Sequence, residues 1–227
     1  MNFDPPKISP LGQRAVIVEL GRIISEDLNA LAIGLATYLE QNPFPGFVEA
    51  APAYSSVYVG YDPHVLIAKL SPPATAFECV ASCVREALSN IEIESDRPAG
   101  HLEIPVSFGG EHGPDLAFVA KANSLSETEV IEIFTASSYR VYMLGFLPGF
   151  AYLGELDPRI ATARRATPRT RVVKGSIGIA DRQTGIYPAE SPGGWQLIGR
   201  TEVEMFLPDL IPPCRIKPGD YIQFNVA

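Results

Sequence analysis

The sequence predicts an α+β protein with two domains, a small ferredoxin-like domain followed by a closed or half-closed β structure. In the first part of the chain, strand-like and helix-like segments alternate in the order βαββαβ. After Tyr139 the helical periodicity stops, and short strand-like runs alternate with Gly and Pro turns. The acidic segment 92–100 contains Pro and Gly and is the best linker. We therefore place the domains at residues 1–94 and 95–227.

The first strand and helix are predicted by composition and spacing. Arg14–Leu20 reads as a strand, because Ala15-Val-Ile-Val is apolar and largely β-branched. Ser25 is a good N-cap, acidic residues follow it, and apolar residues then recur at helical spacing. Pro43 is expected to end this helix.

The remaining elements of the first domain follow the same logic. Strands are expected near Phe47–Ala50 and Ser55–Tyr61. Thr75 and Glu78 form a capping-box pattern at the start of a core-facing helix. His101–Phe108 alternates apolar and polar or small residues, so we expect a strand that either completes the first domain or opens the second.

The second domain begins with helical signals and continues with strands. Pro114 and Asp115 indicate a helix start, with Asp115 in the first turn. Ser126 and Glu129 form a second capping box, which opens a helix through about Phe134. The later strand-like runs are Tyr139–Leu144, Val172–Ile179, Gln196–Ile198 and Tyr221–Val226.

Composition excludes several classes of protein. The chain has 227 residues, a formal net charge of -8 and a pI near 4.9, which argues against a nucleic-acid binder. The N-terminus has no signal-peptide pattern, and apolar stretches fall short of the ~18 residues that a membrane span needs. We therefore expect a soluble, cytoplasmic protein that binds neither nucleic acid nor membrane.

Cysteine and histidine spacing predicts no metal site. The three cysteines include no CxxC pair, and the three histidines stand far apart in sequence. Cys79 and Cys83 lie one turn apart on a predicted helix, where small core packing is the favoured interpretation and metal binding the lesser one.

The most distinctive feature is one basic segment in this acidic chain. Between Arg159 and Ala180 there are six Lys or Arg residues and no Asp or Glu. Such a segment favours an anion or an acidic partner, although a solvated charged loop is the alternative. The cations that we expect to bind the anion are Arg164, Arg165, Arg169 and Lys174.

Turns and neutral donors surround the basic segment. Gly145, Pro148 and Gly149 predict a sharp bend, either to present free amides to an oxyanion or simply to turn a barrel corner. The side chains expected to add hydrogen bonds or ring contacts to the anion are Ser176, Gln183, Tyr187 and Trp195.

Catalytic candidates are few. Glu111, His112 and Ser176 are the residues we name, the first two as an acid/base pair and the last as a nucleophile. Asp115 is close by, and helix capping explains it unless it pairs with the arginines. No His or Cys lies in segment 145–195, which excludes a catalytic triad contained within it, and there is no Walker A motif.

Several longer motifs together resemble the allophanate hydrolase subunit 1 domain, a family shared by the kinase A inhibitor KipI and the B subunit of 5-oxoprolinase. The resemblance spans nearly the whole chain. The residues that carry it are Gly109–Leu116, Tyr139–Phe150, Pro168-Arg169, Gly175–Ile179, Gln183–Pro188 and Ser191–Thr201.

The resemblance implies a ferredoxin-like domain followed by a cyclophilin-like β-barrel. It also implies partners: a paralogous allophanate hydrolase subunit 2-like chain and an amidohydrolase-like subunit, with ATP used by the assembled complex. The chain departs from the family at Phe134-Thr135, where relatives often have His before Thr, and at Lys174, where they often have Pro. The first departure removes a possible acid/base, and the second adds a cation.

Three functions follow from this resemblance. The leading one is a non-autonomous subunit of an ATP-dependent 5-oxoprolinase, which opens 5-oxoproline to glutamate. The alternatives are a KipI-like inhibitor that binds a sensor histidine kinase, and a carboxyltransferase subunit of the allophanate hydrolase or urea carboxylase type. Prolyl isomerisation has only fold analogy behind it.

Overall fold

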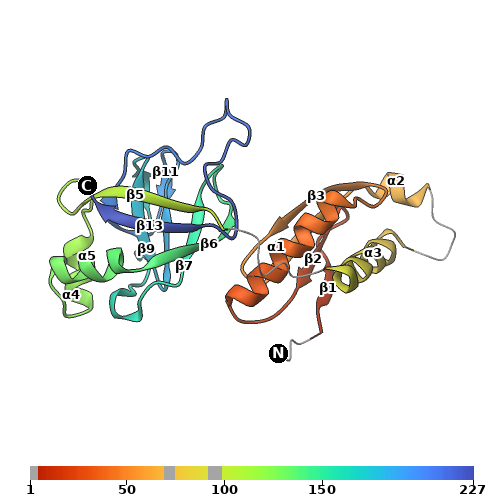
Figure 1. Cartoon of the computed structure of the whole chain (residues 1–227), viewed down its shortest axis with the longest axis horizontal. Helices are drawn as coiled ribbons and strands as arrows, with labels where there is room; N and C mark the ends of the chain where they lie inside the picture. The colour runs from red at the N-terminus through yellow and green to blue at the C-terminus, as the bar shows by residue number, and fades with distance from the viewer. Residues whose placement is uncertain (1–4, 69–74, 92–98) are drawn as a thin grey trace. The chain divides into compact units, whose positions relative to one another are not determined.

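Two compact units make up the protein, Met1–Arg97 and Pro98–Ala227. The computed structural model describes residues 5–68, 75–91 and 99–227 (Figure 1). Each unit has its own buried apolar cluster, so each is stabilised by its own core. The predicted linker at 92–100 and the predicted boundary between residues 94 and 95 fall largely outside the described residues.

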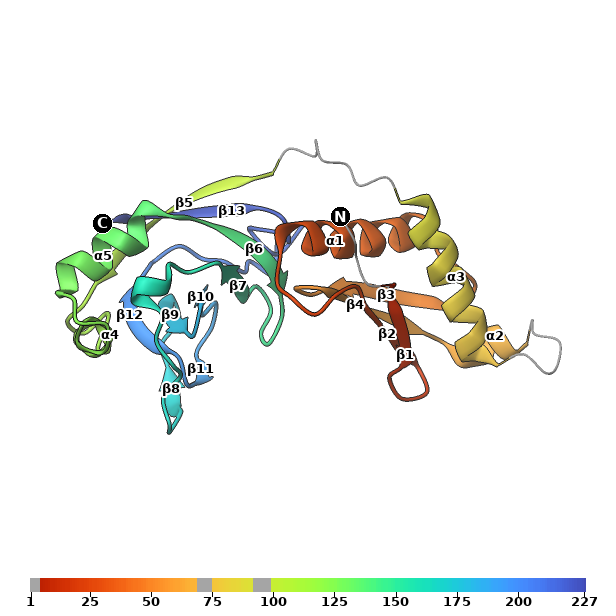
Figure 2. The same cartoon turned by 90° about the horizontal axis from the view of Figure 1, so that it is seen from below.

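The first unit is a four-stranded antiparallel sheet with the order β1-β2-β4-β3. Two long helices cover one face of this sheet, and their buried residues meet the strands' buried residues in one core (Figure 2). The elements are β1 (Lys7–Pro10), β2 (Ala15–Glu19), α1 (Glu26–Gln41), β3 (Phe47–Pro52), β4 (Ser56–Tyr61), α2 (Pro63–Ile67) and α3 (Ala76–Asn90).

The helix starts in this unit are those that the sequence predicts. The Ser25 hydroxyl accepts a hydrogen bond from the Leu28 amide at 3.2 Å, and Thr75 and Glu78 form a complete capping box. A βαββαβ order would make His101–Phe108 the fourth strand of this sheet. In the structure the fourth strand is instead β1, which precedes β2, and His101–Phe108 is a strand of the second unit.

The second unit is a closed barrel with the strand order β10-β7-β6-β13-β5-β12-β9. Strands β5 and β13 pair in parallel, and helices α4 and α5 lie together beside the barrel (Figure 1). The barrel strands are β5 (His101–Phe108), β6 (Ser138–Leu144), β7 (Ala151–Gly154), β9 (Ser176–Ala180), β10 (Gln183–Ile186), β12 (Gln196–Arg200) and β13 (Tyr221–Val226); the helices are α4 (Leu116–Ala122), α5 (Glu127–Ala136) and the 3-10 turn Pro158–Ile160.

One predicted strand is in fact two. The run Val172–Ile179 is divided between β8 (Arg169–Val172), which pairs with β11 (Ser191–Gly193) outside the barrel, and β9 inside it. The break falls at Gly175, which has φ +83° and where a Cβ atom would lie 2.1 Å from the Thr201 carbonyl oxygen. Only glycine fits this combination of backbone angle and close approach.

Candidate functional site

A buried carboxylate, Asp115, organises part of the basic segment. Its Oδ1 accepts hydrogen bonds from Arg165 Nη1 at 3.1 Å and Arg169 Nη2 at 2.7 Å. Its Oδ2 accepts the backbone N–H of Leu197 at 2.7 Å. Helix α4 begins at Leu116 and receives no side-chain cap from Asp115, so the capping interpretation is wrong and pairing with the arginines is the role that the structure gives this residue.

Other cations of the segment are also paired with carboxylates. Arg171 Nε lies 2.7 Å from Glu190 Oε2, and Lys174 Nζ pairs with Glu204. Arg159 pairs with Asp157. Three of the four cations that the sequence suggests for an anion, Arg165, Arg169 and Lys174, therefore already neutralise carboxylates of this chain.

Arg164 differs from these neighbours. Its guanidinium carbon lies 5.8 Å from the ring centroid of Trp195, within cation–π distance. Among the residues that the structure describes, it forms no ion pair within 4.0 Å. The side chain is exposed to solvent, like those of most cations in the segment, but among the described residues Arg164 differs from them in having no carboxylate partner.

Trp195 belongs to an aromatic cluster, by which we mean Phe150, Tyr152, Tyr187 and Trp195. The Phe150 ring contacts all three others, with centroid distances of 4.8 Å to Tyr152, 5.2 Å to Tyr187 and 5.5 Å to Trp195. The Tyr152 and Trp195 rings are 5.9 Å apart. Tyr152 is half-buried, whereas the other three are buried, so it is the member that a ligand can reach.

The phenols of the cluster stay neutral at physiological pH. Burial raises the pKa of Tyr187 above its usual value, and a hydrogen bond from the Trp195 backbone and the nearby Arg164 and Arg169 charges oppose this shift only in part. Burial likewise raises the pKa of Tyr152, against the charge of Arg164. Both side chains can therefore donate hydrogen bonds without carrying charge.

The predicted bend lies next to this cluster. The chain turns between β6 and β7, and the amides of Gly145, Leu147 and Phe150 all bond to carbonyls of the turn itself. These three amides are therefore occupied, which favours the geometric explanation of the bend. Phe146 sits in the turn with φ +67° and is 61% exposed, which is an unusual conformation for a large side chain.

The structure does not bring the three catalytic candidates into one cluster. Ser176 is 4% exposed and lies opposite Arg200 in the β9–β12 ladder. His112 Nε2 lies 3.8 Å from a carboxylate oxygen of Glu111, whose side chain is 89% exposed. Gln183, one of the expected neutral donors, begins β10 at its pairing with Ala180.

Two residues of the site were not predicted from the sequence. Phe150 directly precedes β7 and Tyr152 lies in this strand, and their rings are 4.8 Å apart. The aromatic alternation Phe150-Ala-Tyr152 is the signal in the sequence, but it is only three residues long and lies within a Gly- and Pro-rich motif.

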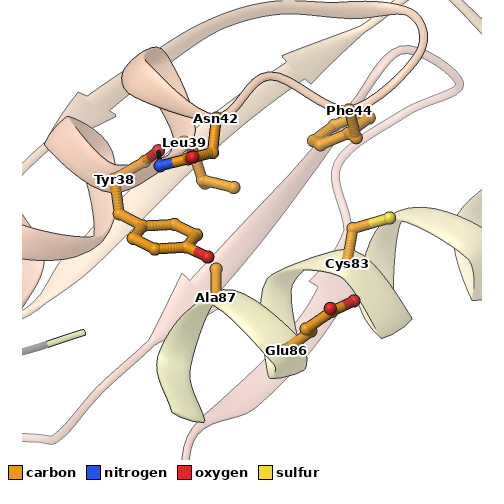
Figure 3. Close-up of a pocket in the computed structure, with 7 residues that line it drawn as sticks. All are labelled: Tyr38, Leu39, Asn42, Phe44, Cys83, Glu86 and Ala87. Atoms are coloured by element: carbon orange, nitrogen blue, oxygen red, sulfur yellow. Dashed lines mark hydrogen bonds between the residues drawn. The ribbon is translucent and has the colours of Figure 1, made fainter. Parts of the chain in front are cut away.

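A separate hollow lies in the first unit, between the end of α1 and helix α3 (Figure 3). Its volume is about 200 Å³, and its lining consists of Tyr38, Leu39, Asn42, Phe44, Cys83, Glu86 and Ala87. Cys79 and Cys83 are free thiols packed against the core, and burial followed by the proximity of Cys79 raises the pKa of Cys83. This packing agrees with the structural interpretation of the two cysteines.

Membrane spans and metal clusters are both absent from the described residues. None of the helices there is both long enough and apolar enough to cross a bilayer. Within the same residues, no group of three His, Cys, Asp or Glu side chains is placed to hold a metal ion.

The fold and the motifs define the class of protein. Residues 6–216 match the family described as "Carboxyltransferase domain, subdomain C and D", and the chain belongs to this family. Individual relatives are more specific. The chain is 44% identical over 219 residues to a Bacillus subtilis protein named as the B subunit of 5-oxoprolinase, an alignment that covers 96% of this chain and 91% of the relative.

Two further comparisons agree with this placement. The Escherichia coli O157:H7 protein of the same name is 39% identical over 216 residues, with 94% of this chain and 93% of the relative covered. The solved structure of TTHA0988 superposes with a TM-score of 0.80 at 36% identity, over 94% of this chain. This chain spans only 40% of the TTHA0988 chain. The resemblance seen in the motifs is thus confirmed.

Proposed function

We propose that this protein is a subunit of an ATP-dependent 5-oxoprolinase, in which it helps to open 5-oxoproline to glutamate together with other chains. The observation that carries the proposal is the end-to-end similarity to two proteins that are named as a subunit of that enzyme. The cytoplasm is the expected location, and the partners are a paralogous chain and an amidohydrolase-like chain.

The chemistry of the site favours a binding role over an autonomous catalytic one. Arg164 and the aromatic cluster offer a cation, ring surfaces and neutral phenols. These groups can hold and orient an anionic substrate, but neutral phenols with raised pKa values are poor general bases at neutral pH. The proton transfers and the nucleotide chemistry are therefore assigned to partner subunits.

ATP fits a partner better than this chain. Polyphosphate binding needs several cations free to face the phosphates. Here Arg165 and Arg169 share the buried carboxylate of Asp115, and Lys174 pairs with Glu204. A nucleotide bound at this segment would have to displace those carboxylates.

Exposed apolar side chains near the site support a partner. Besides Phe146, Leu210 is 54% exposed and Ile211 fully exposed. The latter two belong to the loop between β12 and β13, which extends away from the barrel in Figure 1. The base of this loop contacts the Phe146 turn, because a Cβ atom on Gly149 would lie 2.7 Å from Phe206 Cβ. We assign this surface to the paralogous subunit.

Reconstitution tests the proposal. The chain is co-expressed with the paralogous and amidohydrolase-like subunits, and 5-oxoproline-dependent ATP hydrolysis is measured with and without it. Turnover should require the chain. An Ile211→Ser variant should lose co-purification with the paralogous subunit, whereas Val226→Ser, at another exposed apolar side chain, should retain it. Full turnover without the chain would contradict the proposal.

A further inference from the structure

Charge pairing within the basic segment singles out one residue. Five of the six cations between Arg159 and Ala180 have a carboxylate partner: Arg159, Arg165, Arg169, Arg171 and Lys174. Arg164 is the sixth, and in the described part of the chain its charged group is matched instead with an aromatic ring. An incoming anion therefore meets Arg164 without first breaking an ion pair.

An aromatic ring lies beneath the charged group of Arg164. The guanidinium carbon is over the Trp195 ring, 5.8 Å from its centroid, so the ring attracts the cation from one side. The N–H donors of a guanidinium lie in its own plane and can bind a planar anion in two parallel bonds. Trp195 is 6% exposed and is fixed by edge-on contacts with Phe150 and Tyr152. The cation is therefore supported by a rigid aromatic base, which reduces the conformational entropy lost on binding.

The groups next to Arg164 indicate what the uncharged part of the bound anion is like. Tyr152 is half-buried and its ring lies 5.9 Å from that of Trp195, the same ring that Arg164 approaches to 5.8 Å, so both side chains border Trp195. A flat ring on the bound anion can pack against Tyr152, and its polar edge can bond to the phenol. Inorganic phosphate makes no use of such an aromatic surface.

We propose that Arg164, which lies over the Trp195 ring, binds the carboxylate of a small monoanionic substrate whose lactam ring packs against Tyr152. This inference rests on the proposed function, because it names 5-oxoproline as the ligand of this segment. It assigns to this chain the recognition of the substrate's carboxylate, and it excludes Arg165, Arg169 and Lys174 from direct contact with it.

The first test uses the reconstituted complex. Arg164→Gln should raise the KM for 5-oxoproline at least tenfold while kcat changes by less than threefold, and Arg164→Lys should recover part of the loss. Arg171→Gln is the matched control, since it removes an exposed arginine seven residues away whose partner is Glu190. An Arg164→Gln complex with the wild-type KM would overturn the inference while leaving the proposed function intact.

The second test uses the isolated chain, in which Trp195 is the single tryptophan. Its fluorescence should change saturably with 5-oxoproline, and this change should be lost in Arg164→Gln. The neutral lactam 2-pyrrolidinone should act at least tenfold more weakly, and inorganic phosphate should have no effect. If phosphate changes the Trp195 fluorescence and 5-oxoproline does not, the site binds a simple oxyanion and not the carboxylate of a lactam. That result would overturn the inference whether or not the complex is active.

Discussion

Removing the Asp115 carboxylate should destabilise the barrel strongly. In Asp115→Ala, Arg165 and Arg169 lose their shared partner, and the buried Leu197 amide loses its acceptor. An unsatisfied buried amide costs about 1–3 kcal/mol, and breaking a buried ion pair costs about 3–5 kcal/mol. These costs overlap, and Arg165 is 37% exposed and regains water, so we expect the free energy of unfolding to fall by about 3–4 kcal/mol.

Urea unfolding followed by Trp195 fluorescence measures this loss. The probe reports on the barrel alone, because the only tryptophan lies in the second unit. Glu190→Ala is the control, since its ion pair with Arg171 is largely exposed and should contribute less than about 1 kcal/mol. A loss below about 1 kcal/mol in Asp115→Ala would refute the view that this carboxylate organises the basic segment.

Three other predictions test the fold. Ser126→Ala removes the N-cap of α5 and should lower the free energy of unfolding by about 1 kcal/mol in the same urea assay. Gly113→Ala would put a Cβ atom 2.0 Å from the Ile198 carbonyl oxygen and should lower Tm by about 10 °C or more. Gly194→Ala is the control and should melt like wild type, because the atom nearest to its Cβ would be Pro168 Cγ at 3.6 Å. Equal Tm values for the two variants would contradict the packing around Gly113. Burial raises the pKa of Tyr187 above the usual ~10, so the folded state keeps a proton that the unfolded chain releases. The free energy of unfolding should therefore be unaffected below pH ~10 and should fall as the pH rises further. An absorbance titration that compares the wild type with Tyr187→Phe should show one phenol titrating late in the wild type.

Local signals predicted the individual elements well. Both capping boxes are formed, at Thr75 and at Ser126, and the His101–Phe108 strand has the predicted bounds. These features depend on neighbours within a few residues, so the sequence carries them directly. Strand partners depend on distant segments. The sequence could not show that β1 takes the edge beside β2, or that His101–Phe108 joins the barrel next to β13.

The sequence predicts most of the residues that make up the site, but it offers the pairing of Asp115 with the arginines only as the alternative to helix capping. The sequence located the basic segment and Trp195, yet Asp115 lies about fifty positions before its two arginine partners. Nothing in local spacing shows that those arginines are neutralised or that Arg164 lies over the Trp195 ring. Whether Arg164, Tyr187 and Trp195 contact a substrate stays a prediction.

If this chain is a working subunit of a 5-oxoprolinase, as we propose, the enzyme's turnover must depend on it. The most direct measurement is the rate at which purified partner subunits convert 5-oxoproline to glutamate with ATP, as this chain is added back in increasing amounts. We predict that glutamate production rises from background and saturates at a fixed ratio of this chain to its partners. A rate that does not depend on the added chain would contradict the proposed function.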